Sequence, residues 1–182
     1  MVARQSETAA MNQTSMELKG DREIVIARTF NGPPRIVFDA WTRPELVRRW
    51  WAPNSRRVVV TTCDADVRAG GTYRYVLRLE KTGHQFAFSG RYTEVTPHSR
   101  LVYTELFEPD AGGANPGDIP VIVTVTFAGR DGKTDLVSHS LCPSPEVRDA
   151  ILASGMEHGM RETIDQLDLL VASLQSGQED RS

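Results

Sequence analysis

Residues 144–173 read SPEVRDAILASGMEHGMRETIDQLDLLVAS and predict one long helix near the C-terminus. Ser144 suits the N-cap, because its hydroxyl can accept a hydrogen bond from a backbone N–H of the first turn. Pro145 suits the first helical position, where no N–H is needed. A helix with one apolar face needs an apolar surface to lie on. The apolar stripe recurs at spacings of three and four residues and consists of Met160, Ile164, Leu167, Val171 and Leu174.

Two glycines interrupt the middle of this predicted helix. Gly155 and Gly159 each cost about 1 kcal/mol relative to alanine inside a helix. Close packing against a sheet, or a kink, explains both glycines without a function. The functional alternative is that the glycines, with the flexible side chains of Met156 and Met160, leave room for a ligand beneath the helix.

The rest of the chain supplies strands and a pair of short helices. Residues 23–30 alternate as a strand, and a turn then leads into a short helix that ends near Trp41. A second short helix follows a capping box, in which Thr42 is the cap and Glu45 lies three residues later. From Arg57 onwards, period-two alternation and short turns predict six antiparallel strands. The order β-α-α-β-β-β-β-β-β-α is typical of an α+β fold.

Length and composition predict a single domain with polar ends. The chain has 182 residues and a formal net charge of −3, and we expect a disordered leader at 1–20, a domain at 21–175 and a disordered tail at 176–182. No basic patch, membrane-spanning run or signal-peptide pattern stands out, so we expect no nucleic-acid partner, no membrane span and a cytoplasmic location. Cys63 and Cys142 indicate reduced thiols, with a single disulfide as the alternative.

Motifs for common cofactors and metals do not stand out. The sequence has no phosphate-binding loop, dinucleotide-binding glycine motif or HExxH motif. Asp64 and Asp66 could form a carboxylate pair, but a solvated strand end explains them better. His158 and Glu162 could face one metal ion, but an ion pair along the helix is simpler because no third ligand is in view. We therefore expect no metal and no cofactor.

His139 is the best single candidate for acid–base chemistry, because the pKa of histidine lies near neutrality. In one register of the last strand His139 faces inwards with Val137 and Leu141, whereas in the other register Ser138 and its even-numbered neighbours face inwards. A hydrogen-bonded structural histidine, or an exposed one, explains the residue without catalysis. We assign no catalytic residue.

An aromatic cavity beneath the long helix is the predicted binding site. Tyrosine hydroxyls would give a mostly apolar pocket a few polar anchors. The same side chains could instead fill the core. The residues expected to line the cavity are Trp41, Trp50, Tyr73, Tyr75, Phe86, Phe88, His139, Met156 and Met160.

Several motifs, in this order, resemble those of the START-like superfamily, also called Bet v 1-like or SRPBCC. Within it, the chain is similar to the branch related to the C-terminal domain of the activator of heat-shock protein 90 ATPase. The resemblance spans about residues 24–174 and implies a helix-grip fold, in which a curved antiparallel sheet wraps around a long C-terminal helix. The matching stretches are 38–45 (FDAWTRPE), 49–51 (RWW), 70–73 (GGTY), 90–95 (GRYTEV), 100–105 (RLVYTE), 123–127 (VTVTF) and 155–160 (GMEHGM).

The resemblance implies three alternative functions. The favoured one is binding of an apolar or amphipathic small molecule in a cavity between the sheet and the C-terminal helix. The second is an enzyme similar to polyketide cyclases, dehydratases or hydrolases that uses the same cavity. The third is a co-chaperone-like interaction module with a chaperone partner in the stress response. A homodimer is compatible with each, and the sequence favours a binding protein over an enzyme.

Overall fold

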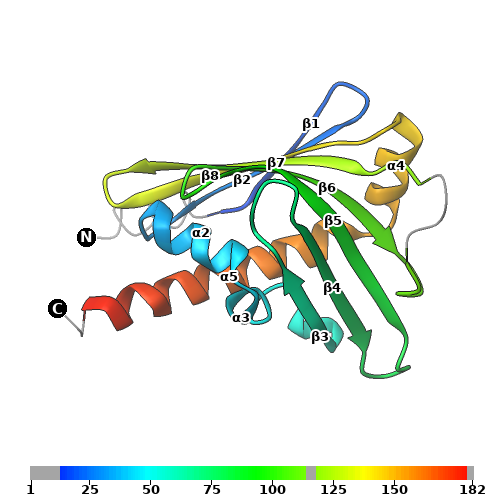
Figure 1. Ribbon diagram of the computed structural model, residues 1–182, viewed down its shortest axis with the longest axis horizontal. Coiled ribbons are helices and arrows are strands. Elements are labelled where there is room, and N and C mark those ends of the chain that lie inside the picture. The colour runs from blue at the N-terminus through cyan, green and yellow to red at the C-terminus, as the bar shows by residue number, and fades with distance from the viewer. Residues whose placement is uncertain (1–12, 114–117, 180–182) are drawn as a thin grey trace.

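The fold is built on one curved antiparallel sheet (Figure 1). The computed structural model describes residues 13–113 and 118–179. In this part of the chain eight strands pair in the order β1-β2-β8-β7-β6-β5-β4-β3. The strands are β1 (Ser15–Lys19), β2 (Glu23–Phe30), β3 (Val58–Ala65), β4 (Thr72–Leu79), β5 (Gln85–Thr96), β6 (Arg100–Glu108), β7 (Val121–Arg130) and β8 (Lys133–Leu141).

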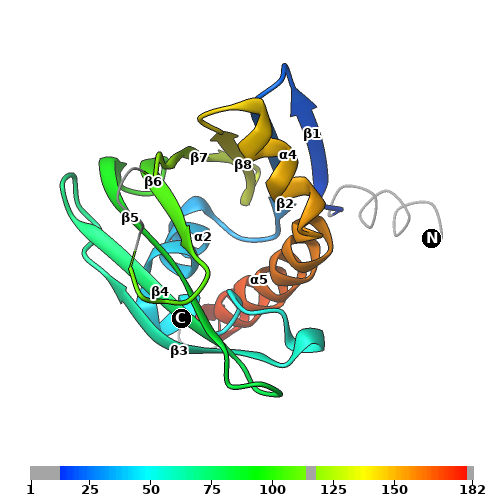
Figure 2. The ribbon, with the colours of Figure 1, turned by 90° about the vertical axis from the view of Figure 1, so that its right-hand side faces the viewer.

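Helices α2 and α5 lie on the concave side of this sheet (Figures 1 and 2). The predicted α+β helix-grip fold is therefore confirmed. No helix in the described ranges is long and apolar enough to cross a membrane. The helical elements are α2 (Pro34–Thr42), α3 (Pro44–Val47), the 3-10 turn η1 (Asn54–Arg56), α4 (Pro145–Ala153) and α5 (Met156–Glu179).

The C-terminal helix is broken in two, so the prediction of one continuous helix is wrong. Gly155 adopts a φ of 74°, a left-handed conformation that glycine adopts without steric cost and that ends a helix. Its N–H donates to the carbonyl of Leu152 at 3.2 Å. The predicted start is confirmed, because the Ser144 hydroxyl accepts a hydrogen bond from the N–H of Val147 at 3.3 Å.

The apolar stripe of α5 packs into the core. Ile164, Leu167 and Val171 are buried, and Met160 and Leu174 are half-buried against the same cluster. The cluster also contains inward-facing side chains of the sheet and of α2, against which α5 packs. The stripe read from the sequence is therefore the face that holds the helix on the sheet.

A buried arginine ties the edge of α5 next to the apolar stripe to the sheet. Arg28 of β2 is buried and forms ion pairs with Asp165 and Asp168 of α5, the second at 3.0 Å. It also donates to the hydroxyl of Thr14 at 3.0 Å. Because a guanidinium has several donors in one plane, this one side chain joins α5, β2 and the residue before β1.

Both ends of the described chain are more ordered than predicted. The disorder expected for residues 1–20 is wrong for Ser15–Lys19, which form β1 and pair with β2, and residues 1–12 lie outside the described residues. The tail expected at 176–182 is helical as far as Glu179, and residues 180–182 also lie outside the described residues. The two cysteines are free, buried thiols and form no disulfide with each other.

The predicted capping box between the short helices is also wrong. Thr42 belongs to α2, where its hydroxyl donates to the carbonyl of Phe38 at 2.7 Å. Arg43 takes the N-cap position of α3 in an extended conformation, because the residue before a proline is disfavoured in a helix and Pro44 follows. Glu45 forms an ion pair with Arg43 at 2.6 Å instead of reaching back to Thr42.

Truncation of the α5 stripe tests this packing. Leu167 is 0% exposed, so Leu167→Ala should lower the free energy of unfolding by about 2–5 kcal/mol in a urea titration. Leu169 on the same helix is 73% exposed, and Leu169→Ala should change it by less than about 0.5 kcal/mol. Equal effects of the two substitutions would show that the stripe is not the buried face.

Candidate functional site

Four tyrosines gather on the concave face of the sheet. Tyr73 and Tyr75 of β4, Tyr92 of β5 and Tyr103 of β6 are all buried. Their side chains meet because alternate residues of a strand point to one face of the sheet. The ring centre of Tyr73 lies 5.1–5.6 Å from those of the other three. These rings form the wall of the interior that faces the helices.

A carboxyl group sits within this aromatic interior. Glu105 follows Tyr103 by two residues on β6 and therefore faces the same way. The Tyr73 hydroxyl lies 3.2 Å from Glu105 Oε2 and 3.3 Å from the carbonyl oxygen of Thr104. The side chains of Tyr75 and Tyr92 are hydrogen-bonded to each other. The polar groups of the wall are thus hydrogen-bonded in pairs.

The indole of Trp41 adds a further polar contact, because it donates a hydrogen bond to the hydroxyl of Tyr103. Trp41 belongs to α2, so this bond connects the helix to β6. Trp51 covers the wall from the connection between α3 and η1, with its ring centre 5.2 Å from that of Tyr75. The site is therefore assembled from the sheet, one helix and one connecting segment.

Gly90 of β5 lets the backbone of β6 and the ring of Tyr73 approach closely at this point. A Cβ at Gly90 would lie 1.7 Å from the carbonyl oxygen of Thr104 and 2.8 Å from the ring of Tyr73. Gly90 is the register partner of Tyr73, and the pairing of β5 with β6 shifts register between Tyr92 and Glu94. The missing side chain thus leaves room for the Tyr73 ring, whose hydroxyl reaches Glu105.

Burial controls the charge of the site. Loss of hydration raises the pKa of Glu105 to about 7, although the hydrogen bond with Tyr73 opposes the change. Burial also raises the pKa of Tyr92 to about 12 and that of Tyr73 well above its usual value. The tyrosines are therefore neutral at pH 7, whereas Glu105 can exist in either form. A carboxyl of this kind can accept a hydrogen bond, hold a cation or transfer a proton.

The free space beside Glu105 is small. The cavity has a volume of about 10 Å³, which is close to the least that one water molecule needs. Aromatic rings fill most of the interior in this conformation. The cavity is lined by Trp41, Trp51, Tyr73, Tyr75, Tyr92, Tyr103 and Glu105.

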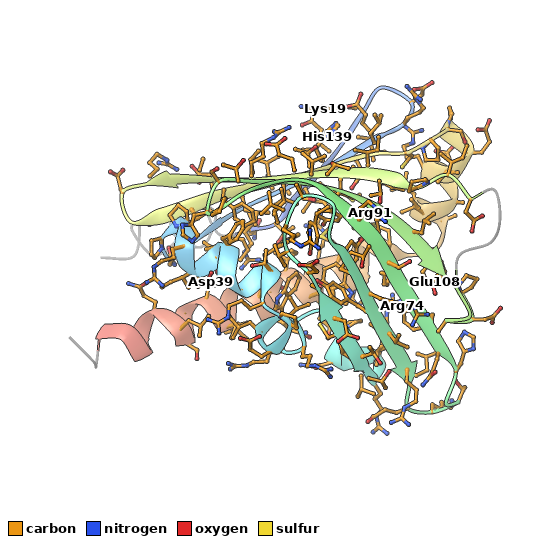
Figure 3. All side chains as sticks on the ribbon, in the orientation of Figure 1. Lys19, Asp39, Arg74, Arg91, Glu108 and His139 are labelled. Carbon is orange, nitrogen blue, oxygen red and sulfur yellow. The ribbon has the colours of Figure 1, made fainter. Side chains whose placement is uncertain are left out.

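Three of the residues predicted to line a cavity, namely Trp41, Tyr73 and Tyr75, do line this one. Trp50 is buried in the core beside it, and its indole N–H donates to the carbonyl of Ala40 at 2.8 Å. His139 lies on the outer face of the sheet (Figure 3). There its Nε2 lies 2.5 Å from Glu23 Oε2.

The last strand takes the register that turns its even-numbered residues inwards. Leu136 and Ser138 are buried, and Thr134 is buried beside them. His139 is therefore directed away from the tyrosines, and the register that would have placed it inside does not occur. The last strand therefore adopts the second of the two registers that the sequence allows, in which Ser138 and its even-numbered neighbours face inwards.

The remaining predicted lining residues lie at the edge of the site. Phe86 and Phe88 are half-buried and contact Phe107 with tilted rings, whose centres lie 5.9 Å and 5.3 Å from that of Phe107. Met160 is half-buried against the core, and Met156 begins α5. Neither methionine borders the cavity of about 10 Å³.

Sequence reasoning missed four of the lining residues. Trp51, Tyr92, Tyr103 and Glu105 lie within the motifs at 49–51, 90–95 and 100–105 that carry the family resemblance, but the sequence does not mark them as lining residues. The alternation of Leu101, Tyr103 and Glu105 along β6 is the signal that could have placed the carboxyl inside.

The other acidic candidates have structural partners. Glu162, which was expected to pair with His158, instead accepts hydrogen bonds from the N–H and hydroxyl of Ser55 at 2.7 and 2.5 Å. Asp64 and Asp66 are exposed, as expected for a solvated strand end. In residues 13–113 and 118–179, no group of three or more His, Cys, Asp or Glu side chains is arranged to hold a metal ion.

A second, open depression of about 460 Å³ lies on the outer face of β4, β5 and β6. At its edge the Glu108 carboxylate is 3% exposed and accepts hydrogen bonds from Arg74 at 2.7 Å, Ser89 at 2.5 Å and the N–H of Gly113 at 3.0 Å. Burial acts to raise the pKa of Glu108, but the hydrogen bonds outweigh it and lower the pKa. Figure 3 shows Arg74, Arg91 and Glu108 in this region. The cluster anchors the segment after β6.

The curved sheet, the helix pair and the closing helix define a START-like protein. A profile of the family described as "Activator of Hsp90 ATPase homolog 1-like protein" matches residues 31–172. The chain belongs to this family. Family and fold together support a ligand-binding or co-chaperone-like module.

Solved structures share the fold. A protein from Rhodobacter sphaeroides is 25% identical with a TM-score of 0.77, covering 89% of this chain and 99% of its own. A protein from Staphylococcus epidermidis is 27% identical with a TM-score of 0.74, and the match covers 87% of this chain and 94% of that protein. A protein from Chromobacterium violaceum is 28% identical with a TM-score of 0.65, and the match covers 81% of this chain and 96% of that protein. Among curated proteins no match is found.

Substitution of Gly90 tests how the site is built. Gly90→Ala should lower the free energy of unfolding by about 3 kcal/mol, because the new methyl group meets backbone atoms that cannot move independently. At Gly112 no atom beyond the residue and its two chain neighbours lies within 4 Å of the position that a methyl group would take, so Gly112→Ala should be nearly neutral in the same denaturant titration. A neutral Gly90→Ala variant would contradict the close approach at Thr104.

The pKa of Glu105 predicts a pH dependence of stability. Its usual value is 4.5 and its value in the folded protein is about 7, so the folded state holds a proton that the unfolded state has lost between these values. Stability contributed by the protonated group is therefore complete below pH 4.5 and is lost as the pH rises towards 7.

Glu105→Gln removes this titration. The free energy of unfolding of the variant, relative to that of the parent, should rise as the pH increases from 4 to 8, by up to about 3 kcal/mol. The measurement is urea unfolding at several pH values. Glu17 is exposed on β1, and Glu17→Gln should show no such gain. If the difference in free energy of unfolding between Glu105→Gln and the parent does not change with pH, the carboxyl of Glu105 is exposed to water.

Proposed function

We propose that this protein binds an apolar or amphipathic small molecule in its concave interior, with Glu105 as the polar anchor. The observation that carries this proposal is the carboxyl group at the centre of an aromatic wall, hydrogen-bonded by Tyr73. Removal of a carboxyl from water is costly. A core that served stability alone would place an apolar side chain there, so the cost supports a functional role.

The wall around Glu105 suits ligand recognition. Binding sites for small molecules are mostly apolar and aromatic, with a few polar groups that orient the guest. Six of the seven lining residues are aromatic, and the seventh is Glu105. Membership of the family agrees with a ligand-binding role, because the START-like resemblance implies a cavity at this place between sheet and helix.

Entry of a ligand requires one side of the cavity to move. The side chain of Trp51 is the lining group that is free to do so. The other lining residues belong to α2, β4, β5 or β6, whereas Trp51 lies between α3 and η1. This connection is attached to α5 through Gln166, which donates to the carbonyls of Trp50 at 3.0 Å and Ala52 at 2.9 Å. A swing of the Trp51 ring would enlarge the cavity while these backbone contacts stay in place.

An aromatic surface leads from Trp51 towards solvent. The ring centre of Trp51 lies 6.1 Å from that of Phe88, which lies 5.3 Å from that of Phe107. Phe107 is 53% exposed. An apolar molecule could therefore contact aromatic rings along the whole way from the surface to the interior, and burial of its apolar area would favour binding.

Glu105 also supports a second candidate function. A carboxyl with a pKa of about 7 can take and return protons at neutral pH, as a general acid–base catalyst does. An enzyme would use the same interior as the binding protein. A compound that binds in the interior would then be chemically converted on incubation with the parent protein, and the Glu105→Gln variant would leave it unchanged.

An NMR titration with the uncharged fluorescent probe N-phenyl-1-naphthylamine tests the proposal. We expect saturable binding of one equivalent and chemical-shift changes at the indole N–H groups of Trp41 and Trp51 and at inward-facing residues of β4, β5 and β6. His139 on the outer face serves as the internal control and should not shift. The absence of saturable binding, or shifts confined to the outer face, would contradict interior binding.

A further inference from the structure

We propose that the molecule bound in the interior is an organic cation, whose ammonium group is held against the Glu105 carboxylate inside a cage of aromatic rings. This inference rests on the proposed function, because it names the class of ligand for the same site. It goes further by predicting the charge of the ligand and the place of that charge.

The lining of the cavity is selective for positive charge. The face of an aromatic ring carries negative potential and attracts ammonium groups. The cavity is bordered by two tryptophans, four tyrosines and one glutamate, and its described lining includes no lysine, arginine or histidine. An anion would therefore meet the Glu105 carboxylate without a cationic partner, whereas a cation would meet an opposite charge and several π systems.

The rings approach this space from several directions. Trp41 comes from α2, Trp51 from the connection before η1, and the tyrosines come from β4, β5 and β6. The ring planes of Trp51 and Tyr75 cross at 68°, and those of Tyr73 and Tyr103 cross at 86°. Rings that cross at such angles form a cage rather than a stack, which is the arrangement that surrounds a rounded ammonium group.

The hydrogen bonds of the wall also favour a ligand that is positive. The hydroxyl of Tyr73 is directed to Glu105, the hydroxyls of Tyr75 and Tyr92 share a hydrogen bond, and the indole N–H of Trp41 is directed to Tyr103. The donors of Tyr73 and Trp41 are therefore used within the protein. An ionised carboxylate can only accept hydrogen bonds, so the group that complements Glu105 is a donor or a cation.

A bound cation would offset the cost of ionising Glu105, which is half-buried. Burial raises the pKa of Glu105 to about 7, which means that ionisation of this group in the empty site is unfavourable. An opposite charge a few ångströms away favours the ionised form. The rings of Phe88 and Phe107 beyond Trp51 would contact an apolar tail of the same molecule. The ligand class is thus an amphipathic organic ammonium ion.

Three probes of nearly equal shape separate charge from apolar contact. Benzyltrimethylammonium is the cation, neopentylbenzene is its uncharged carbon isostere, and phenylmethanesulfonate is the anion. We expect the full-length parent protein to bind the cation at least tenfold more tightly than the isostere, and the anion most weakly. Binding is measured by NMR titration of the indole N–H signals of Trp41 and Trp51.

Glu105→Gln tests the anchor directly. The variant should lose at least tenfold in affinity for benzyltrimethylammonium while its affinity for neopentylbenzene changes less than twofold. Glu94 of β5, which pairs with Arg100 at 3.1 Å, provides the matched control, and Glu94→Gln should bind all three probes as the parent does.

The outcomes separate this inference from the proposed function. Equal affinity for cation and isostere, tighter binding of the anion, or an unchanged cation affinity in Glu105→Gln would overturn the cationic class and leave interior binding intact. Binding of N-phenyl-1-naphthylamine without binding of any of the three probes would also overturn the cationic class and leave interior binding intact. If the parent protein binds none of the four compounds, the proposed function fails together with this inference.

Discussion

Burial of one face of α5 is the constraint on which the rest of the structure depends. Leu167 and its neighbours on the stripe pack against the concave side of the sheet and against α2. Arg28 joins the edge of the helix beside this stripe to β2 through Asp165 and Asp168. The sheet must curve to cover a helix in this way. The same curvature brings the inward-facing tyrosines of β4, β5 and β6 together.

The interior combines stabilising packing with a costly polar group. The tyrosine rings add apolar burial and aromatic contacts, whereas Glu105 costs free energy whenever it is ionised. Gly90 makes this arrangement geometrically feasible, because its missing side chain leaves room for Tyr73 beside Thr104. Selection for stability accounts for the rings but not for the carboxyl, which is the physical basis for a binding role.

Much of the fold could be predicted because it follows from local patterns. The spacing of the α5 stripe, the Ser144 cap and the alternation of the strands depend on near neighbours in sequence. The helix break was not predicted, since two glycines in a helix fit packing, a kink or a ligand equally well, and only the positive φ of Gly155 decides between them. Strand β1 was missed because its short, mostly exposed sequence resembles a polar leader. Glu105 was not predicted because a carboxyl in a strand normally faces solvent, and side chains distant in sequence, such as Trp41 and Trp51, are what enclose it.

The measurement that tests the account most directly is a pH titration of the Glu105 side-chain carboxyl carbon by NMR, with and without benzyltrimethylammonium. The account predicts a midpoint near pH 7 for the free protein, because burial raises the pKa from its usual value of 4.5, and a lower midpoint when the cation is bound. A midpoint near 4.5 that the cation leaves unchanged would place Glu105 in water and contradict an anchor in the aromatic interior.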